Sequence, residues 1–269
     1  MTGPERVAAA FAARRARGQA ALVAYVMGGD PDLRASRDLA LACAKGGADL
    51  LEIGVPFSDP IADGPTIQAA GERALRAGTT PARVLELASE VRRRTAVPIA
   101  LMGYLNPVLA YGEERFLADC AAAGVDALIV PDLPPEEAGE IGRRARQHGV
   151  GMVFLLAPTS TEARRAAACA AATAFVYFVS VTGVTGARRE LPPGLPAQLR
   201  AVRAASPVPV VVGFGVSTPA QARDLARLAD GVVVGSAIVS RAAGGGSRAA
   251  RAARVRRFVA SLARVMRRP

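Results

Sequence analysis

Eight short apolar segments alternate with amphipathic helical segments along this chain of 269 residues. Two of them, residues 210–212 and 232–234, are runs of valine without polar–apolar alternation. Strands of this kind are buried on both faces, as in parallel sheets whose strands are connected by helices. The predicted strands are residues 21–27, 49–56, 98–104, 127–132, 151–157, 174–180, 209–215 and 231–235.

Helical spacing of apolar residues, often with a proline at the start and a glycine at the end, marks the segments between these strands. The predicted helices are residues 4–17, 33–44, 65–76, 81–94, 113–123, 135–148, 161–171, 196–205, 218–228 and 248–266. Eight strand–helix units in a chain of this length favour an α/β fold in which one (β/α)8 TIM barrel closes on itself. A doubly wound open sheet is the alternative.

No break in composition divides the chain, so we expect a single TIM-barrel domain over residues 1–269. Residues 1–18 would form an extra N-terminal helix, and residues 244–269 a glycine-rich linker and a basic C-terminal helix. A short sequence echo supports repeated units. Residues 47–51 (GADLL) resemble residues 124–128 (GVDAL), each at a predicted helix-to-strand junction, and residues 229–232 (ADGV) are a looser copy.

The net charge of +11 raises the question of nucleic-acid binding. Many of the basic residues lie in the last segment, and Lys45 is the only lysine, so the excess reflects a general preference for arginine. We therefore favour a solvated basic helix over a contact with a polyanion. Its apolar positions should cover the barrel: Val255, Phe258, Val259 and Leu262.

Targeting and metal-binding signals are absent from the sequence. No stretch of about 20 apolar residues predicts a membrane span, and the first residues lack the apolar core of a signal peptide. Cys43, Cys120 and Cys169 lack the spacing of metal ligands and are expected to be buried thiols. These observations predict a cytoplasmic protein without a metal site.

Two carboxylates are candidates for general acid–base chemistry. Active sites of (β/α)8 barrels form at the carboxyl ends of the strands. Glu52 lies inside the second apolar segment, where an acidic residue is unusual. Asp63 follows in a loop rich in proline and glycine. The competing interpretation is structural: Glu52 would bond neighbours inside the barrel, and Asp63 would be a turn or helix-cap residue.

Glycines follow the last three predicted strands, where backbone N–H groups can approach an anion closely. The candidate phosphate-binding residues are Gly186, Gly215, Gly235 and Ser236. Ser236 can open a short helix whose N-terminus favours phosphate. Tyr104 and Tyr177 end two strands and either line an apolar substrate pocket or fill the barrel. Taken singly, the glycines are equally explained as tight turns.

Several of these segments resemble signatures of the tryptophan synthase alpha subunit family. The longest is residues 51–68 (LEIGVPFSDPIADGPTIQ). The others follow in order: residues 101–107 (LMGYLNP), 130–134 (VPDLP), 181–186 (VTGVTG), 213–217 (GFGVS) and 235–239 (GSAIV). The resemblance spans about residues 20–240. It departs from the family after the first strand, where Met27-Gly28 replaces a frequent Thr-Ala.

The resemblance implies a lyase of L-tryptophan biosynthesis that cleaves indole-3-glycerol phosphate to indole and glyceraldehyde 3-phosphate. Glu52 would protonate the indole carbon that bears the side chain and then take a proton from the adjacent hydroxyl. Asp63 would accept a hydrogen bond from the indole N–H. The implied substrate-binding residues are Tyr177, Tyr104, Thr185 and Phe214, with the phosphate on Gly186, Gly215, Gly235 and Ser236. Thr185 would close against Asp63.

The resemblance also implies a partner. Family members dock on a tryptophan synthase beta subunit that carries pyridoxal phosphate, in an alpha2beta2 tetramer, while the alpha chain itself uses no cofactor. The contact would involve the loop around Pro56 and Asp59 and the segment near Asn106. Two other interpretations remain: a stand-alone indole-3-glycerol-phosphate lyase, and a non-catalytic scaffold whose basic tail binds a polyanion.

Overall fold

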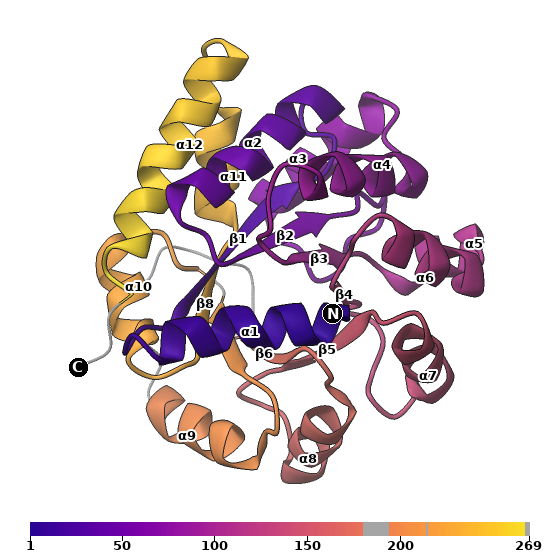
Figure 1. Ribbon diagram of the computed structural model, residues 1–269, viewed down its shortest axis with the longest axis vertical. Helices are drawn as coiled ribbons and strands as arrows, with labels where there is room; N and C mark the ends of the chain where they lie inside the picture. Colours follow the sequence, from indigo (N-terminus) through magenta and orange to yellow (C-terminus); the bar gives the residue numbers. More distant parts are fainter. Residues whose placement is uncertain (180–193, 214, 267–269) are drawn as a thin grey trace.

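Eight parallel strands close into a barrel in the order β1 to β8, with β8 paired to β1 (Figure 1). The computed structural model describes residues 1–179, 194–213 and 215–266. The strands are β1 (Ala21–Met27), β2 (Leu50–Gly54), β3 (Ile99–Met102), β4 (Ala127–Ile129), β5 (Gly151–Leu156), β6 (Phe175–Val179), β7 (Val210–Gly213) and β8 (Gly231–Val234). The predicted TIM barrel is confirmed, and the open doubly wound sheet is excluded because β1 and β8 pair.

Helices surround the barrel and connect its strands. They are α1 (Gly3–Arg15), α2 (Leu33–Gly46), α3 (Pro65–Arg76), α4 (Pro81–Arg92), α5 (Leu105–Tyr111), α6 (Glu113–Ala122), α7 (Gly139–Gln147), α8 (Glu162–Ala171), α9 (Leu195–Ala205), α10 (Pro219–Ala226), α11 (Ser236–Ala243) and α12 (Arg248–Ala263). No helix in these described ranges is both long and apolar enough to span a bilayer.

Several helices differ from their predicted bounds, most of them by one or two residues, and three differences are larger. α5 was not predicted, because its seven residues, ended by Gly112, are too few for a periodic pattern. α7 starts four residues later than expected, since Pro134 and Pro135 form a turn in which the Glu137 N–H bonds the Pro134 carbonyl. α12 ends at Ala263, three residues before the predicted end.

Strand residues alternate between two apolar layers. Val23, Leu50 and Ala100 belong to an inner cluster, whereas Leu22 and Leu51 belong to the large cluster between strands and helices. This alternation has the period of two that every β-strand imposes. Both layers are apolar, which explains why the strand sequences show no polar–apolar alternation.

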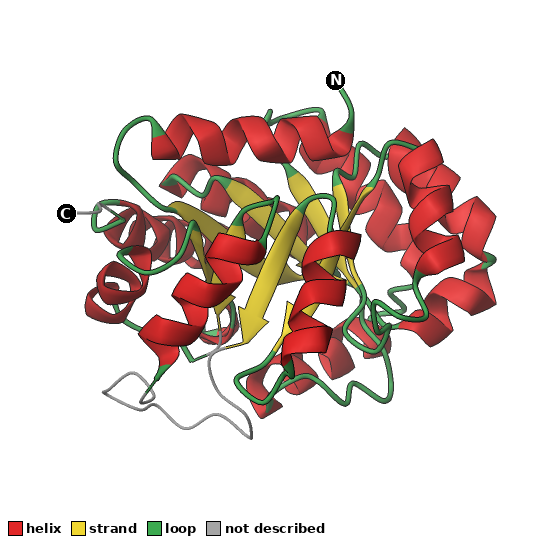
Figure 2. Ribbon diagram, turned by 90° about the horizontal axis from the view of Figure 1, so that it is seen from below, coloured by secondary structure: helices red, strands yellow, loops and turns green. Residues whose placement is uncertain are grey.

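α1 covers one end of the barrel (Figure 2). Val7 and Phe11 of α1 are buried in the inner cluster, where the Phe11 ring lies 6.1 Å from that of Phe175. The Gly3 N–H also donates to the Gly149 carbonyl just before β5, at 2.8 Å. The amino ends of the strands are therefore closed by apolar packing, and the carboxyl ends remain for a site.

The aspartates of the three repeated segments (residues 47–51, 124–128 and 229–232) connect neighbouring strands at the same end of the barrel. Each stands just before an even-numbered strand, and its carboxylate accepts a backbone N–H at the start of the preceding strand. The pairs are Asp49 with Leu22 (2.9 Å), Asp126 with Ile99 (2.7 Å) and Asp230 with Val210 (3.0 Å). The repeat therefore encodes a strand-to-strand clamp.

Arginines of α1 reach all three clamps. Arg6 pairs with Asp126, Arg14 with Asp49, and Arg15 lies 4.0 Å from Asp230. Asp126 has no exposed surface and is also bonded by Arg92 of α4. The N-terminal helix is thus attached to the barrel by charge as well as by apolar contacts.

The basic C-terminal helix α12 packs beside α2 (Figure 1), and Val255, Phe258, Val259 and Leu262 are buried as expected. Several of its arginines bind the chain itself. Arg254 donates to the carbonyls of Arg241 at 2.8 Å and Gly244 at 2.7 Å, and Arg248 pairs with Asp38 at 2.8 Å. Part of the basic charge therefore caps the preceding helix and holds α12 on the barrel.

We predict that Asp126→Asn lowers the free energy of unfolding by about 3 kcal/mol, because Arg6 and Arg92 lose a fully buried charged partner. Urea unfolding monitored by circular dichroism measures this. Asp224→Asn is the control, since its pair with Arg223 is half exposed and should contribute less than about 1 kcal/mol. Equal losses in the two variants would contradict the clamp.

Candidate active site

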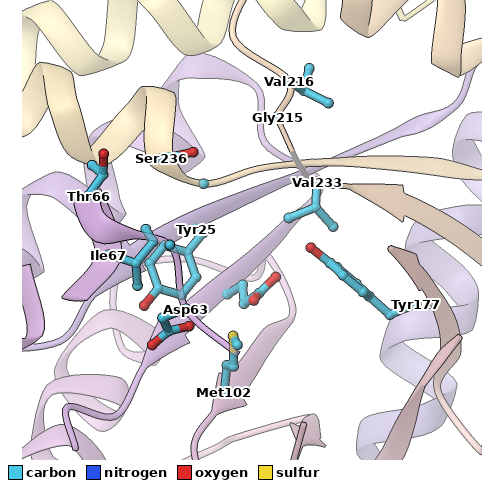
Figure 3. A pocket seen from close by; sticks show the side chains of 13 residues that line it. Tyr25, Asp63, Thr66, Ile67, Met102, Tyr177, Gly215, Val216, Val233 and Ser236 are labelled. Atoms are coloured by element: carbon cyan, nitrogen blue, oxygen red, sulfur yellow. The ribbon is translucent and has the colours of Figure 1, made fainter. Parts of the chain in front are cut away.

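A pocket opens at the carboxyl ends of the strands, opposite α1. Its lining is Tyr25, Glu52, Asp63, Gly64, Thr66, Ile67, Met102, Tyr177, Gly215, Val216, Val233, Gly235 and Ser236. In Figure 3, Asp63 and Met102 lie toward one end and Ser236, Gly215 and Val216 toward the other. The pocket thus has a carboxylate end and a glycine-rich end.

Glu52 points into the barrel because of its place in β2. Leu50, two residues earlier, belongs to the inner cluster, whereas Leu51 and Ile53 belong to the outer one. A period of two therefore turns Glu52 inward. Its backbone pairs with Tyr25 of β1 on one side, and only 2 % of the residue is exposed.

The Glu52 carboxyl is held in its neutral form. Burial, with the nearby negative charge of Asp63 as the second cause, raises its pKa from 4.5 to about 8. One of its oxygens, Oε2, has no hydrogen-bond partner among the described residues. A buried oxygen of this kind costs free energy unless a ligand or water satisfies it. The carboxyl is therefore protonated at neutral pH and has one oxygen free to act on a ligand.

Asp63 comes from the loop between β2 and α3. Gly64 is the N-cap of α3 and Pro65 its first residue, so the loop ends at a rigid helix start. Burial raises the Asp63 pKa from 3.8 to about 6, while a hydrogen bond from the Tyr104 hydroxyl opposes this rise. Asp63 is consequently mainly ionised at neutral pH, unlike Glu52.

Tyr104 ties the Asp63 loop to the end of β3. Its hydroxyl oxygen accepts the Ala62 N–H at 3.0 Å and donates to the Asp63 carboxylate. Its ring lies 5.4 Å from that of Phe57 at the start of the same loop. Tyr104 thus contacts the loop at both ends, and burial together with the charge of Asp63 raises its own pKa.

Tyrosines from β1 and β6 flank the carboxylates, and each lies against a glycine. A Cβ on Gly54 would lie 2.2 Å from the Tyr25 hydroxyl, and a Cβ on Gly213 would lie 2.6 Å from the Tyr177 hydroxyl. Glycine is therefore needed at both positions for the rings to stay in place. Met27 packs behind Tyr25, with its sulfur 3.8 Å from the Tyr25 hydroxyl.

The other end of the pocket is suited to an anion. Ser236 is the first residue of α11, Gly235 is its N-cap, and both line the pocket. The first N–H groups of a helix lack intrahelical partners and carry the positive end of the helix dipole. Gly215 has a φ of 76°, a left-handed conformation that favours glycine.

A family profile described as tryptophan synthase alpha chain matches residues 11–267. The chain belongs to this family. It is 54 % identical over 234 residues to the tryptophan synthase alpha chain of Citrifermentans bemidjiense, covering 87 % of this chain and 88 % of that one. It is 51 % identical to that of Acidiphilium cryptum over 241 residues, 89 % and 87 % of the two chains.

Solved structures of the family share the fold. A structure of Mycobacterium tuberculosis tryptophan synthase superposes with a TM-score of 0.90 at 40 % identity, over 98 % of this chain and 99 % of that one. A tryptophan synthase alpha chain from Legionella pneumophila gives 0.88 at 33 % identity, over 99 % and 97 %. As a member of the tryptophan synthase alpha family, the chain is an indole-3-glycerol-phosphate lyase of tryptophan biosynthesis.

Most of the residues predicted from the tryptophan synthase alpha signatures meet at one site. Glu52, Asp63 and Tyr177 line the pocket together with the predicted phosphate residues Gly215, Gly235 and Ser236. Tyr104 is buried beside Asp63. Thr185, Gly186 and Phe214 lie outside the described residues.

Sequence reasoning missed Tyr25, Met102 and Ile67, which line the pocket. A signal for Tyr25 was available, because it stands two residues before the end of β1, on the same face as the inner-cluster residue Val23. Ile67 could not be placed in this way, since the orientation of α3 against the barrel is a tertiary feature.

We predict that Glu52→Gln becomes more stable than the wild type as pH rises. The unfolded carboxyl loses its proton near the ordinary value of 4.5, whereas the folded one keeps it to about 8, so wild-type stability falls across that window. Gln has no such proton. Thermal unfolding at pH 5, 6, 7 and 8 should show the difference in Tm shifting steadily in favour of Gln.

Glu72→Gln serves as the control for the chemical change itself, because the Glu72 side chain is 63 % exposed on α3. A difference between Glu52→Gln and wild type that stays constant with pH would show that Glu52 is not held protonated.

Proposed function

We propose that Glu52 is the general acid and base of the lyase reaction, and that Asp63 orients the indole and stabilises its positive charge. The observation that carries the proposal is the pair itself. One buried carboxyl with a pKa of about 8 stands in the same pocket as a carboxylate with a pKa of about 6. Two carboxyl groups with pKa values pushed apart are the usual arrangement for separate acid and base roles.

Glu52 first donates its proton to the indole carbon that carries the glycerol phosphate chain. Protonation breaks the aromaticity of the five-membered ring and leaves a positive charge delocalised toward the ring nitrogen. The Glu52 carboxylate then takes the proton of the adjacent hydroxyl. The carbon–carbon bond breaks, its electrons restore the indole, and the carbinol carbon becomes the aldehyde of glyceraldehyde 3-phosphate. The proton balance returns Glu52 to its starting state.

Asp63 supports this step as an acceptor. An ionised carboxylate beside the ring N–H stabilises the charge that develops after carbon protonation, and low dielectric strengthens that effect. The hydrogen bond from Tyr104 favours the ionised form of Asp63. We propose Tyr177 as a substrate-binding residue within the pocket, and Tyr104 as one that acts next to Asp63.

The glycine end holds the phosphate in this proposal. Amides at the N-terminus of α11 and around Gly215 supply donors without a basic side chain in these motifs. Family resemblance adds Gly186 to the phosphate site, Phe214 to the substrate pocket, and Thr185 as the residue that closes against Asp63. The chain is proposed to need no cofactor or metal of its own, and to work in the cytoplasm.

We predict a bell-shaped pH profile of kcat/KM with limbs near pH 6 and pH 8, which belong to the Asp63–Glu52 pair as a unit. Activity should fall below pH 6 as Asp63 gains a proton, and above pH 8 as Glu52 loses its proton. Asp63→Asn removes the acid limb. It also moves the alkaline limb to lower pH, because the charge that helps to raise the Glu52 pKa is gone.

Glu52→Gln should lower kcat at least about 10²-fold, the usual contribution of general acid–base catalysis. Released indole can be separated from the substrate by chromatography and quantified by its fluorescence, to which this tryptophan-free chain adds no indole signal of its own. A Glu52→Gln protein that released indole at the wild-type rate would refute the mechanism.

We further propose that the chain works with a tryptophan synthase beta subunit in an alpha2beta2 tetramer, the partner that would carry pyridoxal phosphate. One M. tuberculosis tryptophan synthase structure is described as an aminoacrylate-bound form, and pyridoxal phosphate supports the elimination that makes such a species. Exposed apolar residues support a docking face here. Ile61 is 83 % exposed in the Asp63 loop, and Leu109 is 54 % exposed on α5.

Mixing with the cognate beta subunit should raise the rate of indole formation. Ile61→Ser and Leu109→Ser should weaken that increase without changing the rate of the isolated chain, because neither lines the pocket. Leu75→Ser is the control, since Leu75 is 37 % exposed outside both segments. No increase on mixing would favour the stand-alone lyase.

A further inference from the structure

The first turn of α3 lines the pocket, and the Asp63 loop ends at the N-terminus of this helix. Ala70 and Ala74 of this helix are fully buried, and they form a small apolar cluster with Tyr25, Met27 and Val239. Ile67, in the first turn of the helix, packs on the same cluster and lines the pocket. Apart from Ile67, α3 contributes only small side chains to this cluster, and none of these contacts is a directional polar bond.

A bidentate ion pair ties the far end of α3 to the loop after β1. Arg73 donates through Nε to Asp30 Oδ1 at 2.7 Å and through Nη2 to Oδ2 at 2.8 Å. The Asp30 side chain is only 6 % exposed and that of Arg73 is 35 % exposed. Two parallel hydrogen bonds between the planar guanidinium and carboxylate groups fix their relative orientation as well as the distance between them.

A second close contact adjoins the ion pair. A Cβ on Gly29 would lie 2.0 Å from the Thr79 hydroxyl, which follows the end of α3, and Thr79 is 5 % exposed. The loop after β1 and the C-terminal end of α3 thus meet at two adjacent points. Gly29 and Asp30 lie within three residues of the end of β1. These contacts therefore fix the position of α3 relative to the rigid barrel.

We propose that Asp30 and Arg73 are positioning residues for Asp63. This inference rests on the proposed role of Asp63 in the lyase reaction. Arg73 is nine residues beyond Gly64, about 13 Å along a helix, so it acts on Asp63 through the helix and not by contact. Neither residue is part of the pocket lining.

The N-terminal end of α3 passes this constraint to Asp63. The Gln68 side chain donates through Nε2 to the Asp63 carbonyl at 2.9 Å, and the Gln68 N–H donates to the Gly64 carbonyl at 3.0 Å. A shift of α3 therefore moves the Asp63 backbone with it. Glu52 stays in place because it belongs to β2, so the geometry between the two carboxyl groups changes.

The test is a set of variants assayed for indole release at 25 °C. Arg73→Met keeps the side-chain length and removes the ion pair, and should lower kcat/KM about tenfold or more, mainly through kcat, because a misplaced catalytic group is costly. Arg73→Lys should recover part of the loss, since lysine restores the charge but not the two parallel bonds. Arg76→Met is the matched control on the same helix, with an exposed partner in Glu72, and should stay within twofold of wild type.

Two readouts separate positioning from loss of structure. The inhibition constant of glyceraldehyde 3-phosphate should stay within twofold in Arg73→Met, because Gly215, Gly235 and Ser236 follow β7 and β8 closely and are held by those strands. In an Asp63→Asn background, Arg73→Met should cause no further loss of kcat/KM, as expected when one residue acts only through the other.

Each outcome decides the proposal. Wild-type kcat/KM in Arg73→Met, or an equal further loss in the Asp63→Asn background, would overturn it. A weakened affinity for glyceraldehyde 3-phosphate that matches the loss of activity would also overturn it, because it would show a general collapse of the site. If Asp63→Asn itself were fully active, the proposed role of Asp63 would fail, whatever Arg73 did.

Discussion

Closure of the parallel sheet between β1 and β8 is the constraint on which the site depends. A closed barrel gives every second strand residue an interior position from which water is largely excluded. Leu50, Ala100 and Val211 fill such positions at little cost, but Glu52 occupies one with a carboxyl group. Burial holds the proton on that carboxyl to about pH 8, so the same packing that stabilises the barrel prepares an acid.

The two ends of the barrel serve different purposes. At the amino ends, α1 and the repeated aspartates join strands to one another through fully made hydrogen bonds and ion pairs. At the carboxyl ends, polar atoms are left incompletely paired, as with Glu52 Oε2 among the described residues. Stability is therefore built where no ligand binds, and a destabilised group is kept where one does.

Much of the fold could be predicted from the sequence, because strands that are buried on both faces consist of unbroken apolar runs such as residues 232–234. Motif resemblance supplied the roles of Glu52 and Asp63, which spacing left open. α5 was missed, since a helix of seven residues is too short to show a clear period. The arginines of α12 were expected to be solvated, but Arg254 caps α11, a contact that depends on how the two helices meet.

The sequence by itself determined the order and number of strands, the inward position of Glu52 in β2 and the glycines that leave backbone N–H groups accessible. These features follow from local periodicity and from the lack of a side chain at glycine. Both depend only on residues that are close together in the sequence. Only the tertiary structure decided that Tyr104 bonds Asp63, that Tyr25 fits against Gly54, and that Asp30 and Arg73 fix α3. Those contacts join residues from different strands and helices, and only the pairing and packing of neighbouring units bring them within bonding distance.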